Sequence, residues 1–325
     1  MSADEAIDVR QLTHAYGTRT ALNETDLRVQ RGEIFAVLGP NGSGKTTLFR
    51  ILSTLLPPQA GKVRVLGHDV GRDAPKVRKL IGVGFQATSL DKKLTVDENL
   101  AQQAYLYGIH GRQLRDRRSE VLQRLGITDR RSDFVETLSG GLKRRVDLAK
   151  SLLHQPTILL LDEPSTGLDP GARSDLWRYL RGLRETHGMT LMVTTHLLEE
   201  ADRADRIMIM NEGQVVATGE PGKLRESIGE HSITVESDFP EKLCEQLNRL
   251  WNCQATLVGR DVRFPSSDRT NQLPRLIEEF PDLVKSVKLG RPTLEDVFIE
   301  KTGHRFWQDN DGEPMMSQEK ESPAR

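Results

Sequence analysis

Apolar residues follow two different spacings along the first two thirds of the chain. Continuous apolar runs, such as residues 34–38 and 158–161, fit strands that lie buried inside a parallel sheet. Residues 140–153 instead place apolar side chains at helical spacing after a serine, which predicts an amphipathic helix with an N-cap. Residues 7–12 and 25–29 fit short antiparallel strands beside this core, so together these elements predict an α/β domain with a mixed sheet.

The predicted α/β domain covers residues 1–225 and contains a mostly helical subdomain over about residues 92–153. The subdomain opens with Thr95 and Glu98, which have the spacing of a capping box at a helix start. Two apolar segments joined by residues 211–213, Asn-Glu-Gly, predict a hairpin that closes the domain. The pattern therefore predicts one large domain with a helical insertion.

The last third of the chain predicts a small second domain over residues 226–303. Its segments follow the order β-α-β-β-α-β, which is typical of a ferredoxin-like α+β fold. A final helix is expected to start at Thr293, with Asp296 completing its cap. Residues 304–325 are mostly polar and are expected to form a disordered tail. The small domain fits a stabilising or dimerising appendage as well as it fits ligand sensing.

The segment after the first buried strand carries the clearest chemistry. Residues 39–47 read Gly-Pro-Asn-Gly-Ser-Gly-Lys-Thr-Thr and match the phosphate-binding loop G-x-x-x-x-G-K-[ST]. Glycines let backbone N–H groups surround a phosphate, and the helix that follows directs its positive N-terminal end toward it. Lys45 can reach the β- and γ-phosphates, and the Thr46 hydroxyl can hold Mg²⁺. We therefore expect a nucleoside triphosphate site here.

Two further segments point to catalysis and to a partner chain. Asp162 and Glu163 end a buried strand, at the edge where open α/β sheets place their ligands. Asp162 is expected to hold Mg²⁺, and Glu163 to orient or deprotonate a water molecule. Ser139, Gly140 and Gly141 start a helix and form a second candidate anion site. One chain needs only one anion-binding helix start for its own nucleotide, so this second helix start suggests a phosphate bound by a partner chain. A capped surface helix would have the same sequence pattern.

Composition argues against several other classes of protein. The chain has 325 residues and a formal net charge of −1, and its basic clusters are interleaved with acidic residues, so nucleic acid is not expected as a partner. Two cysteines are too few for a disulfide framework or a zinc site and fit a reducing cytosol. No apolar run approaches the about 20 residues that cross a bilayer. A role in transport would therefore require a separate membrane subunit.

The order of these motifs over residues 5–225 resembles the ATP-binding subunit of an ABC transporter. Residues 39–47 match its Walker A motif, residues 138–141 its signature, and residues 158–163 its Walker B motif with the catalytic glutamate. One departure is Leu142-Lys143, where many members have glutamine, but the signature residues before it are retained. The resemblance implies the following roles for individual residues.

The resemblance implies that Lys45, Glu163 and the switch histidine His196 are catalytic, and that Tyr16 stacks on adenine. It implies that Thr46, Gln86 and Asp162 hold Mg²⁺, and that Asp169 lies in the D-loop that links two subunits. The signature residues, which are Ser139, Gly140 and Gly141, would act on the ATP of the partner subunit. The implied nucleotide-binding residues are Tyr16, Gly39, Pro40, Asn41, Gly42, Ser43, Gly44, Lys45, Thr46, Thr47 and Gln86.

The resemblance also implies a function and a set of partners. It implies an ATPase that uses ATP and Mg²⁺, pairs as a homodimer or a heterodimer, and powers a separate transmembrane permease from the cytoplasmic face of the membrane. Residues 94–100 and 293–299 resemble the exporter branch that includes daunorubicin-type drug pumps, polysaccharide exporters and sodium exporters. The resemblance therefore implies efflux of a drug, a lipid, a polysaccharide or an ion. The alternatives are a soluble ABC ATPase outside transport, which usually carries a long coiled coil or two cassettes, and a nucleotide-binding module that does not hydrolyse.

Overall fold

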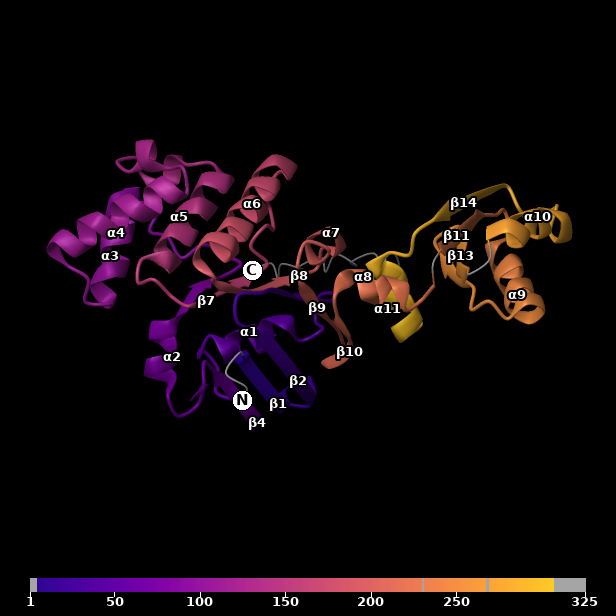
Figure 1. Ribbon diagram of the computed structural model, residues 1–325, viewed down its shortest axis with the longest axis horizontal. Helices are drawn as coiled ribbons and strands as arrows, with labels where there is room; N and C mark the ends of the chain where they lie inside the picture. The colour runs from indigo at the N-terminus through magenta and orange to yellow at the C-terminus, as the bar shows by residue number, and fades with distance from the viewer. Residues whose placement is uncertain (1–4, 230, 267–268, 307–325) are drawn as a thin grey trace, which may run out of the picture.

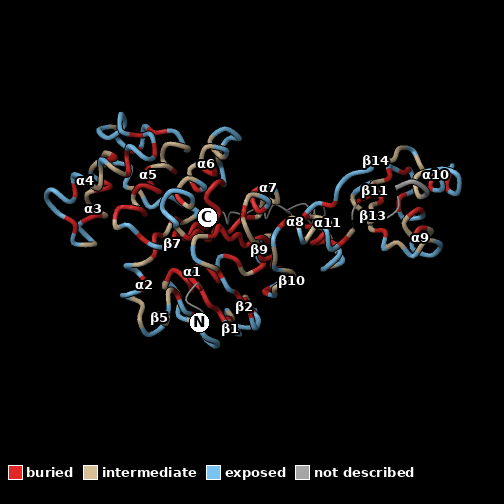
Figure 2. Tube along the Cα trace, in the orientation of Figure 1, coloured by how far each residue is buried: buried red, intermediate tan, exposed pale blue. Residues whose placement is uncertain are grey.

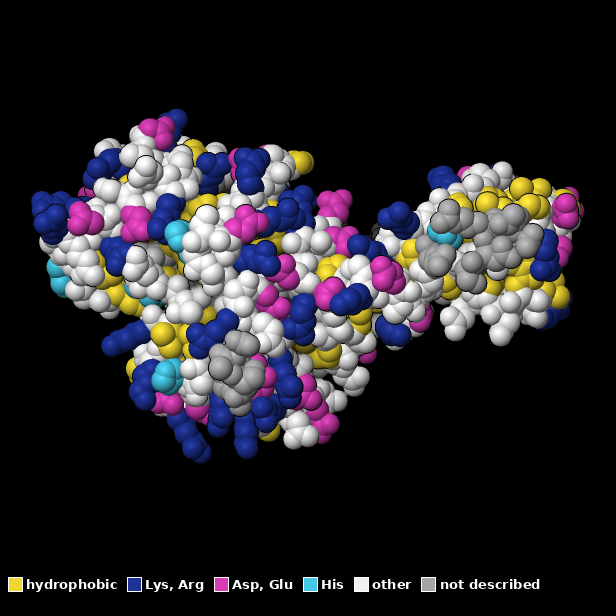
Figure 3. Space-filling model, viewed as in Figure 1, with side chains coloured by type: hydrophobic (Ala, Val, Ile, Leu, Met, Phe, Trp, Pro, Cys, Tyr) yellow, Lys and Arg dark blue, Asp and Glu magenta, His cyan; other side chains and the backbone are white. Residues whose placement is uncertain are grey.

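The computed structural model describes residues 5–229, 231–266 and 269–306 of the chain. These residues form a large α/β cassette and a smaller lobe, which is joined to the cassette by a narrow neck (Figures 1 and 3). Basic and acidic side chains are interspersed over much of the face drawn in Figure 3. Every helix within the described ranges is too short or too polar to span a bilayer.

A six-stranded sheet forms the centre of the cassette and is the most continuously buried part of Figure 2. Its neighbouring strands β9, β3, β8, β7 and β6 run parallel, and β10 pairs antiparallel to β9 at one edge. The predicted buried strands β3 and β7 lie inside this sheet, and all of their residues are buried. In sheet order, the strands are β10 (Gln214–Gly219), β9 (Arg206–Asn211), β3 (Ile34–Leu38), β8 (Thr190–Thr195), β7 (Ile158–Asp162) and β6 (Ile81–Gly84).

Each face of the central sheet is covered by a different layer. One face packs with α1 (Lys45–Leu52) and an antiparallel sheet, through alternate strand residues such as Phe35 and Val37. The other face packs against helices, including α6 (Pro170–His187), through the strand residues that alternate with Phe35 and Val37. The antiparallel sheet has the order β2 (Arg19–Gln30), β1 (Glu5–Tyr16), β4 (Ala60–Val65) and β5 (His68–Asp69), and α2 (Ala74–Leu80) precedes β6.

The predicted helical subdomain is present between β6 and β7 and lies at one end of the molecule (Figure 1). Thr95 and Glu98 form the predicted capping box at the start of its first helix. Its elements are α3 (Val96–Leu106), α4 (Gly111–Arg124), the 3-10 turns η1 (Thr128–Arg130) and η2 (Val135–Thr137), and α5 (Gly140–Leu152). This subdomain therefore carries the signature residues on α5, away from the antiparallel sheet.

The smaller lobe contains a four-stranded antiparallel sheet with its own apolar core. Ile233 and Val235 from one strand pack with Leu243 and Leu247 from a helix in this core. The sheet order is β12 (Thr256–Val258), β13 (Asp261–Ser266), β11 (His231–Glu236) and β14 (Ser286–Gly290), with helices α9 (Pro240–Trp251) and α10 (Arg269–Glu279). The chain order β-α-β-β-α-β thus agrees with the prediction for this region.

The end of the chain differs from the prediction at two points. The final helix α11 (Leu294–Thr302) has the predicted cap from Thr293 and Asp296, but it packs on α8 (Pro221–Glu226) and β10 of the cassette. Phe298 of α11 belongs to the main cassette core and not to the core of the smaller lobe. Phe306, placed by prediction in a disordered tail, is 1% exposed and contacts Phe298 edge to face. Residues 307–325 of the predicted tail lie outside the described residues.

Candidate functional site

The phosphate loop has the backbone geometry of an anion site. Helix α1 begins at Lys45, and its N-cap Gly44 has φ 103°, a left-handed conformation that glycine adopts without strain. No side chain caps the first N–H groups of α1, so they remain available to an anion. Gly39 is equally constrained, because a Cβ there would lie 2.4 Å from Ser43 Oγ and 2.5 Å from Met210 O.

Lys45 is buried inside this loop. Its Nζ donates to Gly39 O at 2.8 Å and to Pro40 O at 2.9 Å, and lies 3.7 Å from Glu163 Oε1. Burial lowers the pKa of Lys45, while Glu163 and Asp162 act in the opposite direction. The loop thus directs a desolvated cation toward the two carboxylates that end β7.

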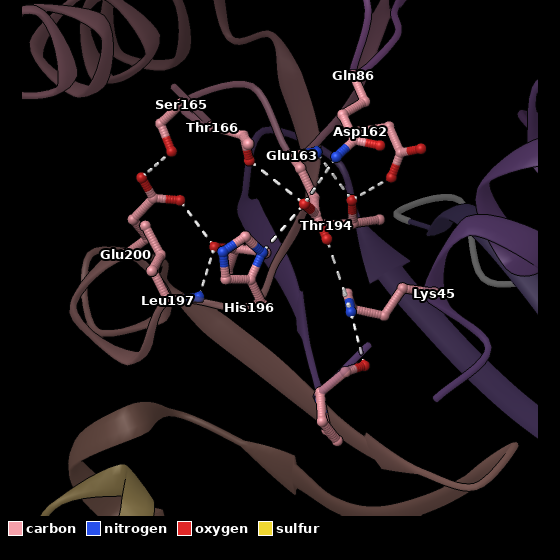
Figure 4. A network of polar contacts seen from close by, with 12 residues as sticks. Lys45, Gln86, Asp162, Glu163, Ser165, Thr166, Thr194, His196, Leu197 and Glu200 are labelled. Carbon is pink, nitrogen blue, oxygen red and sulfur yellow. Dashed lines mark hydrogen bonds and ion pairs between the residues drawn. The ribbon is translucent and has the colours of Figure 1, made fainter. Parts of the chain in front are cut away.

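Glu163 is the centre of the polar network drawn in Figure 4. Its Oε2 lies 3.0 Å from Nδ1 of His196 and accepts from Gln86 Nε2 and Thr166 Oγ1, each at 3.3 Å. The backbone of Glu163 has φ 45°, which is unusual for a residue other than glycine and is found at functional sites. Side chains from three separate loops therefore converge on one carboxylate oxygen.

Asp162 lies behind Glu163 and is held by the neighbouring strand. Thr194 Oγ1 donates to Asp162 Oδ1 and accepts from the backbone N–H of Glu163 at 3.0 Å. Burial raises the pKa of Asp162, and the hydrogen bond from Thr194 opposes that shift. Thr194 thus fixes both residues of the carboxylate pair, and no sequence motif indicated this role.

A cavity of about 460 Å³ joins most of the predicted nucleotide-binding residues. Arg19 and Ala21 also line it, although the sequence pattern did not single them out. Arg19 Nη2 donates to Gly42 O at 3.4 Å, so β2 supports the phosphate loop from the side. The predicted residues on the cavity wall are Tyr16, Asn41, Gly42, Gly44, Lys45, Thr46, Thr47, Gln86 and Glu163.

Tyr16 lies at the end of β1 on the wall of this cavity. Tyr16 is 46% exposed, and its ring meets the His14 ring edge to face with centroids 5.0 Å apart. An exposed aromatic face beside a phosphate loop can stack on a planar base.

The signature residues lie elsewhere. Ser139 is the N-cap of α5, and its Oγ accepts from the N–H of Leu142 at 3.3 Å. Asp169 caps α6 in the same way through the N–H of Ala172 at 2.9 Å. Both residues, with Gly140 and Gly141, line a separate groove of about 840 Å³. The groove and the ATP cavity share no lining residue among the described residues, so a single chain does not bring Ser139 to Lys45.

Glu200 supports the backbone around His196, and no sequence motif indicated this role. It is 1% exposed and accepts from Thr195 Oγ1 at 2.8 Å and from Ser165 Oγ. Thr195 Oγ1 in turn accepts from the N–H of Leu197 at 3.0 Å, which fixes the backbone on both sides of His196. In sequence Glu200 lies in an acidic pair on the short helix α7 (Leu198–Ala201), a pattern that usually faces solvent.

Comparisons with known proteins agree with this geometry. A family model described as "ABC transporter" matches residues 22–166. Daunorubicin resistance ATP-binding protein DrrA3 of Streptomyces coeruleorubidus is 42% identical over 308 residues, covering 93% of this chain and 97% of that protein. The chain belongs to the ABC transporter family as an ATP-binding protein. This confirms the predicted cassette fold and ATP as the nucleotide, and it makes the chain an ATPase of the transporter class rather than a non-transport ABC protein.

Two further matches extend along the same cassette. The Nod factor export ATP-binding protein I of Rhizobium etli is 36% identical over 303 residues, covering 93% of this chain and 94% of that protein. The dimeric structure of MJ0796, a bacterial ABC transporter cassette, superposes with a TM-score of 0.60 and 29% identity, covering 66% of this chain and 98% of that chain. The similarity to the Nod factor export protein therefore extends beyond the cassette into the smaller lobe.

Proposed function

We propose that this chain powers export through a membrane permease by hydrolysing ATP at Glu163. The observation that carries this proposal is the convergence of His196, Gln86 and Thr166 on Glu163 Oε2, with Lys45 beside Oε1. In this arrangement Glu163 accepts a proton from the attacking water, and His196 orients the carboxylate. Lys45 and the uncapped N–H groups of α1 offset charge on the transferring phosphoryl group.

Mg²⁺ fits the donors at this site. Thr46, Gln86 and Asp162 offer a hydroxyl, an amide oxygen and a carboxylate, which are the hard oxygen ligands that Mg²⁺ prefers. Only one of the three carries a negative charge, which suits an ion that takes most of its ligands from substrate phosphates and water. We propose that these three residues hold Mg²⁺, which supplies charge neutralisation at the phosphates when it is bound.

A second chain is needed to complete the site. Ser139, Gly140 and Gly141 border a groove apart from the ATP cavity, and Asp169 borders the same groove. The dimeric cassette among the solved structures supports a pairing in which each signature faces the ATP of the other chain. We propose such a head-to-tail dimer, with two composite sites if the two chains are identical and with Asp169 at the subunit contact.

The exporter assignment rests on the relatives. One of them is a daunorubicin resistance protein and another a Nod factor export protein, which supports efflux of a small molecule as the process that this chain drives. We propose that the permease is a separate polypeptide and that the chain is held by it at the cytoplasmic face of the membrane. The substrate path then lies in the permease.

We propose that the permease docks on the helical subdomain beside Gln86. Phe134 supports this site, because it is an apolar residue that is 50% exposed. Its backbone pairs with Thr95 in an isolated antiparallel β-bridge, and Thr95 caps α3, the helix that follows the Gln86 loop. Phe134→Glu is expected to reduce recovery of the chain with membranes of the producing cells by at least about tenfold, since a charge replaces apolar contact. Sedimentation of membranes followed by quantification of the bound chain measures this.

Phe239→Glu is the matched control, because Phe239 is 60% exposed on the smaller lobe. It is expected to leave membrane recovery unchanged. Equal recovery of the two variants would contradict docking at the helical subdomain, and recovery of neither wild type nor variants would contradict a membrane partner altogether.

Tyr16→Ala is expected to weaken ATP binding by about 1 kcal/mol, or about fivefold in Kd, because it removes the aromatic face on the cavity wall. Tyr16→Phe keeps that face and is expected to bind ATP like the wild type. Equilibrium titration with ATP compares the three proteins, and equal affinity of the Ala and Phe variants would reduce Tyr16 to a packing role.

We also propose that the smaller lobe is a ferredoxin-like unit over residues 231–290. Its strand order β12-β13-β11-β14 and its antiparallel pairing throughout support this, with two helices in the connections. The boundary after β14 is supported by the packing of α11 on the cassette. On this division, α11 anchors the lobe to the ATPase core.

A further inference from the structure

Arg144 is a buried arginine on α5, the helix that Ser139 caps. Arg144 is 4% exposed, and its Nη1 lies 3.3 Å from Oδ2 of Asp147 on the same helix. Asp147 is itself only 3% exposed. Neither residue belongs to the motifs that define the ATP site. The ATP-site motifs therefore do not explain why α5 carries a buried ion pair.

The guanidinium of Arg144 binds backbone next to two site residues at once. Its Nε donates to Pro164 O at 2.7 Å, and Pro164 follows Glu163 in the chain. Its Nη1 donates to Phe85 O at 2.5 Å, and Phe85 precedes Gln86. Gln86 and Glu163 are themselves in contact through Gln86 Nε2. Arg144 thus joins α5 to both loops that meet at the catalytic carboxylate.

The far side of the Gln86 loop is held by the same helix. Asp147 Oδ1 accepts from the N–H of Ser89 at 3.1 Å and from its Oγ at 3.2 Å. Lys150 Nζ donates to Ser89 O and lies 3.2 Å from Ser89 Oγ. Residues 85–89 are therefore bound to α5 at both ends, so a displacement of this loop is transmitted to the helix.

Stability alone is a poor reason for this arginine. Burial lowers the pKa of Arg144 and raises that of Asp147, so each charge is disfavoured by its surroundings. Nη2 of Arg144 is buried without a hydrogen-bond partner among the described residues. Buried ion pairs often stabilise a fold no better than apolar side chains of similar size. An arginine does offer a planar fork that reaches two loops at once, which no apolar side chain can do.

We propose that Arg144 is a positioning residue that couples the ATP bound in its own chain to the signature presented to the partner. When the loops of Gln86 and Glu163 respond to nucleotide, Arg144 carries their position to α5 and therefore to Ser139 at its N-terminus. The inference rests on the proposed head-to-tail dimer. Arg144 acts through backbone contacts and touches no reacting atom.

The test uses Arg144→Met and Arg144→Lys in a full-length Glu163→Gln background, where slow hydrolysis preserves ATP-bound dimers. ATP affinity is measured by titration at protein concentrations below those of dimer formation, and ATP-dependent dimerisation by analytical ultracentrifugation. We expect the Kd for ATP to change by less than about twofold, and the dimer dissociation constant to rise by about tenfold, within the usual range of coupling between sites. Arg144→Lys keeps the charge but loses the fork, so it is expected to weaken dimerisation as well.

Arg118→Met is the matched control. Arg118 also bridges a helix to a backbone carbonyl and an aspartate, through Asp97 O at 3.3 Å and Asp97 Oδ2 at 2.9 Å, but within the helical subdomain. Its loss is expected to leave the dimer dissociation constant unchanged. Thermal unfolding of all variants identifies any effect that comes from stability alone, and if Arg144→Met does not fold, the comparison of Arg144→Lys with the control decides.

The outcomes separate this inference from the function on which it rests. If the Glu163→Gln chain with Arg144 intact does not dimerise with ATP, the head-to-tail dimer itself is wrong. If that chain dimerises and the Arg144 variants dimerise equally well, the coupling role is wrong while the dimer remains. A parallel loss of ATP affinity and dimerisation would also overturn the coupling role, because it would show a general structural defect.

Discussion

Glu163→Gln is expected to slow ATP hydrolysis by about 10²–10⁴-fold while ATP still binds, the range that follows loss of a general base. Glutamine has the size of glutamate and can still meet His196 and Gln86, whose nitrogens lie 3.0 and 3.3 Å from Glu163 Oε2. It cannot accept a proton from water. The geometry of the site is thus preserved and only its proton acceptor is removed.

Steady-state phosphate release by the purified proteins measures this effect, and ATP titration shows that binding is retained. Glu185→Gln is a suitable control, because Glu185 is an exposed residue on α6. It should hydrolyse ATP at the wild-type rate. Equal rates for Glu163→Gln and the wild type would remove Glu163 from the catalytic step.

The elements of the ATP site could be predicted because their signals are local. The phosphate loop needs a strand, glycines at fixed positions and a helix, and all of these are adjacent in sequence around Lys45. Glu163 and His196 both follow apolar strands, and β7 and β8 are parallel neighbours whose ends meet at one edge. The apolar pattern of the strands, together with the rule that parallel strands end at the same edge of a sheet, was therefore sufficient to predict that these two residues lie in one site.

The supporting residues could not be predicted, because their roles depend on contacts between distant segments. Glu200 and Arg144 are charged residues in helices, and each would ordinarily be assigned to a solvent-facing position. Burial and the contacts to Thr195 and Pro164 give them their roles. The docking of α11 on the cassette was missed for the same reason, since its apolar face does not identify the surface that it covers.

Lys45→Ala and Ser139→Arg are each expected to lower the ATPase rate of a homodimer by at least about 10²-fold, the usual cost of removing one preorganised donor at a charged transition state. The first substitution removes the cation that lies inside the phosphate loop. The second places a bulky charge at the N-cap of α5, the end of the helix that faces the partner's ATP in the proposed dimer. In both homodimers every composite site carries one lesion.

A dimer that contains one chain of each variant has a different distribution of lesions over its two composite sites. When one chain carries Lys45→Ala and its partner carries Ser139→Arg, one composite site has both lesions. The other site pairs an intact phosphate loop with an intact signature. If both substitutions lie in one chain and the partner is wild type, each composite site is damaged once. The two dimers contain the same substitutions and differ only in how they are distributed.

The ATPase rate of these two heterodimers, purified through different affinity tags on the two chains, tests the central claim most directly. The proposed composite site predicts that the dimer with lesions on separate chains recovers activity, up to half of the wild-type rate, and that the dimer with both lesions on one chain is inactive. The reverse result, with activity only where one chain is entirely wild type, would show that the signature serves the ATP of its own chain and would contradict the account.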